Sequence, residues 1–264
     1  MNELNNVRLA ITNIYGQDAK MLADFALKFG FEGIDWSLSF DLSEKDFLRE
    51  MDMLKGFEVR YHCPWPHIDF AYADQRAEEA MYIFREMIGL VSKAGGRYMT
   101  VHIGLGQSSA KKLDWEKAIE NLSALVLYGA ELGITICLEN ITTAWTINPK
   151  RFRTLVERTG AGVTLDIGHV HASRKNKLLE DFFKLYVLPN KDRILNAHIY
   201  HTENPQQDHV APESLEQIFD RLWLLRSVTG CDWWLIELSN PDEILKTRDF
   251  LIQFLSFFEK SQVR

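Results

Sequence analysis

The sequence predicts an α/β protein built as a single (β/α)8 barrel spanning residues 1–264. Short aliphatic and β-branched runs alternate with longer segments of helical period, which is typical of a parallel sheet covered by helices. Eight such runs occur, so each strand with its helix and loops takes about 33 residues, as this kind of barrel requires. No low-complexity stretch, Ser/Gly linker or charge block divides the chain, and we therefore expect one domain.

The candidate strands are short, largely apolar runs spread evenly along the chain. They are VRLAIT from Val7, GIDWS from Gly33, EVRYH from Glu58, RYMTVH from Arg97, ITICLE from Ile134, GVTLD from Gly162, ILNAHI from Ile194 and WWLIEL from Trp233. The segments between them are long enough for a helix that returns the chain to the same end of the sheet, so we expect parallel strands.

Two of the intervening segments carry clear helix boundaries. In LDWEKAIENLSALVLYGAELG, we expect Asp114 to cap the start of the helix and Gly133 to end it. The apolar stripe of this helix is predicted to contain Ile119, Leu122, Leu125 and Val126. The last helix begins at NPDE, with Asn240 as its cap and Pro241 in its first turn. It is predicted to face the barrel through Leu251, Phe254, Leu255 and Phe258.

The composition limits the classes of partner and the cellular location. The 30 Lys and Arg residues against 37 Asp and Glu residues give a net charge of −7, which disfavours nucleic acid as a partner. No window approaches the roughly 20 apolar residues of a membrane span, and MNELNNVRLA does not resemble a secretory signal. We therefore expect a cytoplasmic protein without a membrane partner. Cys63, Cys137 and Cys231 lie far apart and are expected to be free thiols.

Groups that bind divalent metals stand at the ends of six predicted strands. They are His62, His102, Glu139, Asp166, His198 and Glu237. Because a barrel is closed, residues at the carboxyl ends of its strands converge on one mouth. Three carboxylates crowded there would repel one another unless a cation neutralised them, so the pattern predicts a divalent-metal site. His62 and His102 taken singly are more typical of hydrogen-bonded structural groups than of ligands.

The motifs around these residues resemble the xylose isomerase-like TIM-barrel superfamily along nearly the whole chain. The matching motifs are YHCP at His62, TVHIG at His102, CLEN at Glu139, TLDIGH from Asp166 to His169, AHIYH at His198 and LIEL at Glu237. This superfamily contains sugar isomerases and epimerases, inosose dehydratase-like enzymes and type IV apurinic endonucleases. The resemblance implies the barrel fold and a metal-dependent activity, and homo-oligomers are common among its members.

The resemblance also implies a ligand set. Residues matching the ligands of the single catalytic metal of the isomerases and epimerases are Glu139, Asp166, His198 and Glu237. The metal would be Mn, Co, Zn or Mg, and no organic cofactor is expected. In the endonucleases, the positions of His62 and His102 hold a further zinc, whereas in isomerase-like members they contact substrate or have no role.

Two positions depart from the family patterns. His169 and His209 match two ligands of a third endonuclease zinc, but the aspartate that completes that site is Gln207 here. A neutral amide is a poor zinc ligand, so a complete three-metal centre is not expected, although Asp208 is adjacent. His201 stands where the isomerases commonly have an aspartate, and it is a candidate either for substrate contact or for the ligand role of His198.

The resemblance implies an isomerase or epimerase acting on a small sugar, polyol or cyclitol. A carboxylate would remove the proton next to a carbonyl that the metal polarises, giving an enediolate. Glu139 and Glu237 would exchange the proton from opposite sides, and His169 would stabilise the enediolate. Trp36, Trp65 and Trp145 follow strand ends and are candidates for an aromatic wall against the substrate, although core packing is equally compatible with them.

Two other functions remain open at this stage. A zinc-dependent apurinic endonuclease would use His62, His102, His169 and His209 to hydrolyse a phosphodiester. The net charge, Gln207 and the lack of a basic recognition loop other than RKNK from Arg174 speak against it. A barrel that binds a sugar or a partner without turnover is the third hypothesis, but both glutamates needed for catalysis are present.

Overall fold

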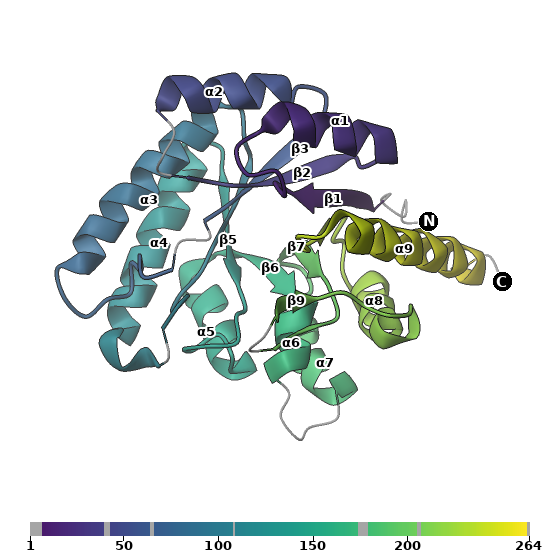
Figure 1. The fold of residues 1–264 in the computed structure, drawn as a ribbon. Helices are drawn as coiled ribbons and strands as arrows, with labels where there is room; N and C mark the ends of the chain where they lie inside the picture. The colour runs from purple at the N-terminus through teal and green to yellow at the C-terminus, as the bar shows by residue number, and fades with distance from the viewer. Residues whose placement is uncertain are drawn as a thin grey trace.

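Eight parallel strands close into a barrel at the centre of the molecule, as the sequence predicts (Figure 1). Around the barrel the order is β1, β10, β7, β6, β5, β4, β3 and β2, and β2 pairs back onto β1. The barrel strands are β1 (Arg8–Thr12), β2 (Gly33–Ser37), β3 (Glu58–His62), β4 (Tyr98–Val101), β5 (Thr135–Glu139), β6 (Gly162–Asp166), β7 (Ile194–Ile199) and β10 (Trp233–Ile236). All eight coincide with the predicted runs to within two residues at either end.

This computed structural model describes residues 7–39, 43–63, 66–107, 109–173, 179–204 and 207–262. Within those ranges, the side chains of Leu179, Glu180, Gln207 and Gln262 are not described. Among the residues that are described, none of the helices has both the length and the apolar character needed to cross a bilayer.

Helices surround the barrel and connect its strands (Figure 1). They are α1 (Ala19–Phe29), α2 (Glu44–Met53), α3 (Arg76–Lys93), the 3-10 turn η1 (Ala110–Lys112), α4 (Trp115–Glu131), α5 (Pro149–Thr159), α6 (Ile167–Ser173), α7 (Leu179–Asn190), α8 (Glu216–Val228) and α9 (Pro241–Gln262). The predicted caps are confirmed: Asp114 accepts a hydrogen bond of 2.8 Å from the Lys117 amide, and Asn240 accepts one of 2.9 Å from the Asp242 amide. Gly133 ends α4 with a φ of 74°, a left-handed conformation that glycine adopts without strain.

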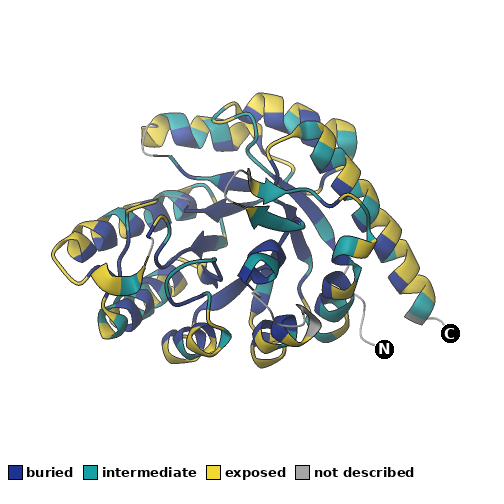
Figure 2. Ribbon diagram, turned by 60° about the horizontal axis from the view of Figure 1, so that its bottom comes forward, coloured by how far each residue is buried: buried dark blue, intermediate teal, exposed yellow. Residues whose placement is uncertain are grey.

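The main apolar core lies between the barrel wall and the helices, which are buried on their inner faces and exposed outside (Figure 2). Successive side chains of a strand point to opposite sides of the barrel wall. On β2, Asp35 lies within 3.7 Å of His62 inside the barrel, so Trp36 faces the helices. Trp36 is fully buried in the core there, and the expectation that it forms a wall of the substrate site is wrong.

The amino-terminal half of the barrel interior is filled by a buried arginine and its partners. Arg60 donates to Glu58 Oε1 at 2.9 Å, to the Leu195 carbonyl at 2.8 Å and to Asn196 Oδ1. Its guanidinium also lies over the rings of two aromatic residues, 4.0 Å from Tyr98 and 4.3 Å from Trp233. This end of the barrel is therefore closed by a charge with a full set of partners.

A short antiparallel hairpin follows β7 at the other end of the barrel and was not predicted. It consists of β8 (Thr202–Asn204) and β9 (Gln207–Val210), which pair through Thr202 with Val210 and Asn204 with Gln207. The hairpin packs on α6, close to the carboxyl ends of β6 and β7 (Figure 1). It therefore brings Glu203 and His209 to the mouth of the barrel.

Candidate metal centre

Four predicted ligands converge at the mouth of the barrel. They are Glu139, Asp166, His198 and Glu237, and one ligand atom from each lies within 4.8 Å of the others. Glu139 ends β5, Asp166 ends β6, His198 lies near the end of β7, and Glu237 directly follows β10. Neighbouring registers pair Asp166 with His198 and His198 with Leu235, which sets these groups at similar heights. The barrel thus assembles a three-carboxylate, one-imidazole group from four separate strands.

Two oxygen atoms in this group are buried without a hydrogen-bond donor. Asp166 Oδ1 accepts the His169 amide at 2.6 Å, but Asp166 Oδ2 has no donor although it is fully buried. Glu237 Oε2 lies 2.9 Å from His198 Nδ1 without an aligned hydrogen bond. Buried polar atoms are nearly always satisfied, so these oxygens are suited to a cation. Carboxylate and imidazole donors fit Mn, Co, Zn or Mg.

Asn140, the last residue of CLEN, holds the neighbouring candidate ligand in place. The Asn140 side chain donates to the Asp166 carbonyl and accepts from the Asp166 amide, both at 2.9 Å. The Asn140 carbonyl lies 2.8 Å from His169 Nδ1 and accepts its proton. Asn140 therefore positions both Asp166 and His169, a role that sequence reasoning missed because an amide at a strand end carries no pattern of its own.

The four groups shift one another's ionisation. Burial alone would raise the pKa of Glu139, but His198 and His102 hold it well below its usual value. Burial would also raise the pKa of Glu237, but the neighbouring His198 holds it below its usual value. Burial would lower the pKa of His198, whereas the flanking glutamates raise it well above its ordinary value. Burial, with repulsion from Glu139 and Glu237, raises the pKa of Asp166 to about 7.

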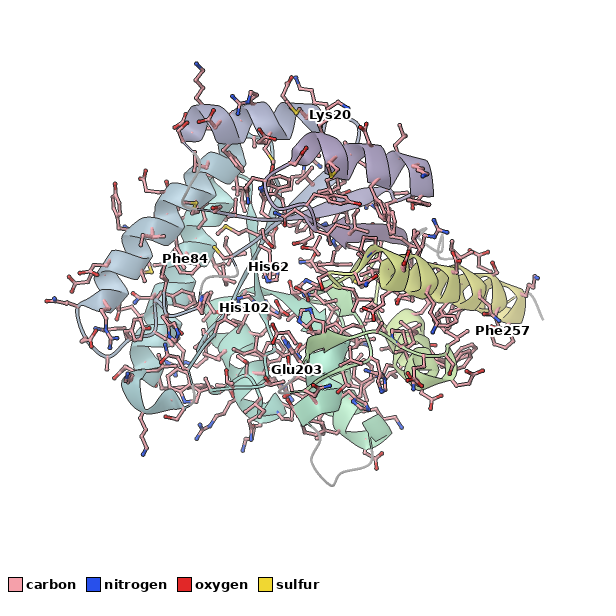
Figure 3. All side chains as sticks on the ribbon, viewed as in Figure 1. Lys20, His62, Phe84, His102, Glu203 and Phe257 are labelled. Atoms are coloured by element: carbon pink, nitrogen blue, oxygen red, sulfur yellow. The ribbon has the colours of Figure 1, made fainter. Side chains whose placement is uncertain are left out.

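His62 and His102 form a second group with Glu139. The two Nε2 atoms lie 3.1 Å apart, and Glu139 Oε2 is 3.2 Å from His62 Nε2 and 2.8 Å from His102 Nε2. The Nδ1 atom of His102 donates to the Cys63 carbonyl at 3.0 Å, which turns its Nε2 toward the carboxylate. Burial lowers the pKa of His102 despite Glu139, so this imidazole is neutral near pH 7. Both side chains are labelled near the centre of the barrel in Figure 3.

A third group contains His169, Glu203 and His209, whose ligand atoms also lie within 4.8 Å of one another. Glu203 Oε2 is 3.1 Å from His169 Nε2, and its Oε1 accepts the Thr142 hydroxyl at 2.5 Å. His209 stacks on Tyr200 with ring centroids 4.2 Å apart. Sequence reasoning looked for the missing carboxylate at Gln207, whereas the hairpin supplies it from Glu203. No local motif could have indicated this, because the contact depends on the fold of the hairpin.

The glycine of LDIGH is required by close packing. A Cβ atom on Gly168 would lie 2.1 Å from the Tyr200 ring, so any other residue would displace that ring. The ring lies edge-on to His169 at a centroid distance of 6.0 Å. Burial would lower the pKa of His169, but Asp166, with Glu203 and Glu139, raises it to about 10.

Asp35 is a buried carboxylate that sequence reasoning did not single out. Its Oδ1 atom has no hydrogen-bond donor and lies 3.7 Å from His62 Nδ1. Burial raises the pKa of Asp35 above its usual value. Asp35 is the middle residue of GIDWS, two residues before the strand ends, so the strand-end pattern that picked out the other candidate ligands did not mark it.

The remaining predicted substrate contacts lie elsewhere. Arg221 donates to His201 Nδ1 at 3.2 Å, the His201 ring lies 4.6 Å from His171, and His201 belongs to none of the ligand groups among the described residues. Trp145 is buried against Trp115 with centroids 5.1 Å apart, because the loop after β5 folds it onto α4 rather than toward the mouth. Trp65 lies outside the described residues.

A cavity of about 690 Å³ opens above the ligands. It is lined by groups from all three clusters, among them His62, His102, Glu139, His169, Glu203, His209 and Glu237. No Lys or Arg occurs among the described residues that line it. The cavity therefore offers acceptors, imidazoles and cation ligands to a small polar molecule.

Comparison with known families decides the classification. A family model described as xylose isomerase-like TIM barrel matches residues 23–245. The chain belongs to this family. The motifs that carry the resemblance, including CLEN and LDIGH, lie inside the matched region.

Two known proteins are similar to this chain over most of its length. An uncharacterized protein of Methanocaldococcus jannaschii is 28% identical over 203 residues, covering 76% of this chain and 81% of that protein. A D-tagatose 3-epimerase-like protein superposes with a TM-score of 0.79 and 17% identity, over 96% of this chain and 99% of that one.

Two further solved structures share the fold. An L-ribulose 3-epimerase has a TM-score of 0.76 and 16% identity, over 97% of each chain. The IolI protein with a bound zinc atom has a TM-score of 0.70 and 17% identity, over 94% of this chain and 98% of that one. These likenesses establish a shared barrel architecture.

Proposed function

We propose that the protein is a divalent-metal-dependent isomerase or epimerase of an unphosphorylated sugar or cyclitol. One observation carries the proposal: Glu139, Asp166, His198 and Glu237 bring ligand atoms within 4.8 Å of one another at the barrel mouth. The orphaned oxygens of Asp166 and Glu237 support a resident cation. Epimerases among the structural neighbours, and the zinc in IolI, support the same assignment.

The substrate class follows from the charge of the cavity. Its described lining combines Glu139, Glu203, Asp208 and Glu237 with no Lys or Arg side chain. A phosphate or carboxylate group would be repelled by these acids, whereas hydroxyl groups would donate hydrogen bonds to them. A neutral, hydroxylated molecule of small size is therefore the expected substrate.

The two glutamates move the proton. A cation held by the four ligands would polarise the substrate carbonyl and its neighbouring hydroxyl, and so acidify the C–H bond between them. Glu237, whose side chain is 14% exposed, faces the cavity and removes that proton from one side. In an epimerisation the opposite face takes a proton from Glu139, which must therefore carry one at that step, and the roles exchange with direction. The lowered pKa of Glu237 keeps its carboxylate ionised and able to accept the substrate proton.

His169 stabilises the negative charge that develops on the substrate oxygens. Its Nδ1 atom donates a hydrogen bond to the Asn140 carbonyl, so the Nε2 atom is the one that faces the cavity and Glu203. A pKa raised to about 10 keeps this imidazole protonated and able to donate from Nε2.

Zinc-dependent phosphodiester hydrolysis is the second candidate, because one specific observation favours it. Glu203 completes a ligand group with His169 and His209, beside the groups that contain His62 with His102 and Asp166 with His198. Three neighbouring zinc ions could activate water for attack on an apurinic site. The net charge of −7 and the acidic cavity speak against a nucleic-acid substrate.

The direct experiment incubates the metal-loaded protein with ketopentoses, ketohexoses and keto-cyclitols in deuterium oxide. We expect deuterium at the carbon next to the carbonyl of at least one substrate, detected by NMR, and loss of this exchange in Glu237→Gln. Absence of exchange with every ketone, combined with cleavage of abasic DNA by the zinc-loaded protein, would replace the isomerase proposal with the hydrolase.

A further inference from the structure

A second cavity of about 450 Å³ lies beside the metal cavity. Its walls come from the loop after β5, the end of α6 and the β8–β9 hairpin, through Thr142, Ile147, Ala172, Ser173, Glu203 and Asp208. None of the steps of the proposed isomerisation uses this space. We call it the side cavity.

The side cavity and the metal cavity share Glu203 and Asp208 as lining residues. Glu203 is held from both sides, since Oε1 accepts the Thr142 hydroxyl at 2.5 Å and Oε2 lies 3.1 Å from His169 Nε2. His169 and Glu203 face the metal cavity, whereas Thr142 faces the side cavity. The two cavities therefore adjoin at a fixed carboxylate, on the α6 side of the mouth where Figure 3 labels Glu203.

The lining of the side cavity has two kinds of surface. Thr142, the buried Ser173, Glu203 and Asp208 provide hydroxyl and carboxylate oxygens, and Ile147 and Ala172 provide aliphatic surface. The described lining contains no Lys or Arg. A sugar ring matches both surfaces, because its hydroxyl groups donate to oxygen acceptors while its C–H face packs on aliphatic side chains. Among the described lining residues, a phosphate would meet the carboxylates of Glu203 and Asp208 and no cationic side chain.

We propose that the side cavity is a second sugar subsite, so that the ketose or cyclitol turned over at the metal site is one unit of a glycoside or disaccharide. The inference rests on the proposed function and extends its small neutral substrate to one that carries a second sugar ring. The reacting unit lies above Glu139 and Glu237, and the second ring extends past Glu203 over Ile147 and Ala172. Binding energy from this remote ring is realised at the reacting carbon as a higher kcat/KM.

The test compares free ketoses with ketose disaccharides. Deuterium exchange by the metal-loaded enzyme is measured with D-fructose, D-tagatose, turanose, lactulose and isomaltulose. We expect the best disaccharide to exceed its own free ketose in kcat/KM by at least about tenfold. Ala172→Trp fills the side cavity and is expected to bring the ratio of the two kcat/KM values close to one. The matched control Ala172→Ser leaves the cavity open and is expected to leave this ratio unchanged.

A second variant guards against misfolding of Ala172→Trp. Asp208 is exposed, so Asp208→Ala is expected to fold normally and to lower the same ratio severalfold. Equal kcat/KM for free and glycosylated ketoses, unchanged in both variants, would overturn the subsite while leaving the isomerase function intact.

A failure of the proposed function has a different signature. If no ketone of either size exchanges deuterium, saturation-transfer NMR with lactulose measures occupancy of the side cavity directly. Contacts to the galactose ring that disappear in Ala172→Trp would uphold the subsite, and contacts unaffected by this variant would overturn it.

Discussion

Charged side chains are buried at both ends of the barrel interior, but the two ends differ in how completely these side chains are hydrogen-bonded. At the amino-terminal end, Arg60 bonds to Glu58, Asn196 and the Leu195 carbonyl and stacks on aromatic rings. At the carboxyl-terminal mouth, Asp166 and Glu237 keep oxygens that have no donor. Burying a polar oxygen without a hydrogen-bond donor is costly, and it persists only where something else compensates it. We infer that the hydrogen-bonded groups around Arg60 stabilise the barrel, whereas Asp166 and Glu237 are available to bind a ligand.

Between these two ends, the barrel interior holds polar side chains that bond to one another. Above Arg60, Asn196 donates to Thr164 Oγ1 at 2.9 Å, and the hydroxyls of Thr164 and Thr100 are 2.8 Å apart. The next groups toward the mouth are the histidines and carboxylates of the ligand clusters. These polar side chains are thus paired with one another, whereas oxygens of Asp166 and Glu237 at the candidate active site have no donor, and this contrast can be tested by substitutions at both ends.

The largest expected effect is on catalysis at the mouth. Glu139→Gln and Glu237→Gln each remove a proton acceptor, so kcat for deuterium exchange is expected to fall by at least about 10³-fold. Asp232→Asn, which alters a partner of Arg8 at the opposite end, is the matched control and should change kcat less than about threefold. Near-normal exchange in either glutamate variant would remove the two-carboxylate mechanism.

The affinity for metal should depend steeply on pH. Metal binding displaces protons from its ligands, and each displaced proton changes the apparent Kd about tenfold per pH unit. His198, with its raised pKa, gives up a proton throughout the neutral range, whereas Asp166 is protonated only below its pKa of about 7. Affinity should therefore fall with decreasing pH, and more steeply below pH 7 than above it. Calorimetry in buffers of different ionisation enthalpy measures the protons released, and a pH-independent Kd would contradict this ligand set.

At the amino-terminal end, the expected effect is on stability alone. Arg60→Met leaves Glu58 and Asn196 without their buried partner and should lower the free energy of unfolding by about 3 kcal/mol, measured with urea. Arg8→Met removes a side chain that is 35% exposed and should cost less than about 1 kcal/mol. Neither variant should alter the amount of metal bound, and loss of metal from Arg60→Met would break the distinction between the two ends.

The smallest effect is expected at Asp35. Its pKa is raised in the folded protein by burial, so the folded state holds this proton more tightly than the unfolded chain does. The stability contributed by protonated Asp35 is present at low pH and is lost as the pH rises through the raised pKa. Asp35→Asn should therefore stabilise the metal-free protein at pH 7 by about 1 kcal/mol or less, and by less still at pH 4. Urea unfolding at the two pH values decides, and destabilisation at pH 7 would assign Asp35 a bonding role.

The sequence predicted the barrel and the convergence of its four candidate ligands because both depend on strand periodicity. Glu139, Asp166 and His198 each end or nearly end an apolar run, and a closed barrel brings such ends together whatever the loops do. Glu203 could not be predicted, because its approach to His169 depends on the hairpin after β7. The prediction for Trp36 failed because proximity to a strand end does not determine whether a side chain faces the barrel interior or the helices.

The measurement that tests the account most directly is the metal content per chain. The protein is purified without chelator, equilibrated with trace Mn, Co, Zn and Mg, and analysed by mass spectrometry beside Asp166→Ala and His209→Ala. We expect about one tightly held ion in the unsubstituted protein, its loss in Asp166→Ala and its retention in His209→Ala. An unsubstituted protein that binds no divalent ion, or an Asp166→Ala variant that binds it equally well, would contradict the claim that the unpaired oxygens at the mouth are kept for a metal.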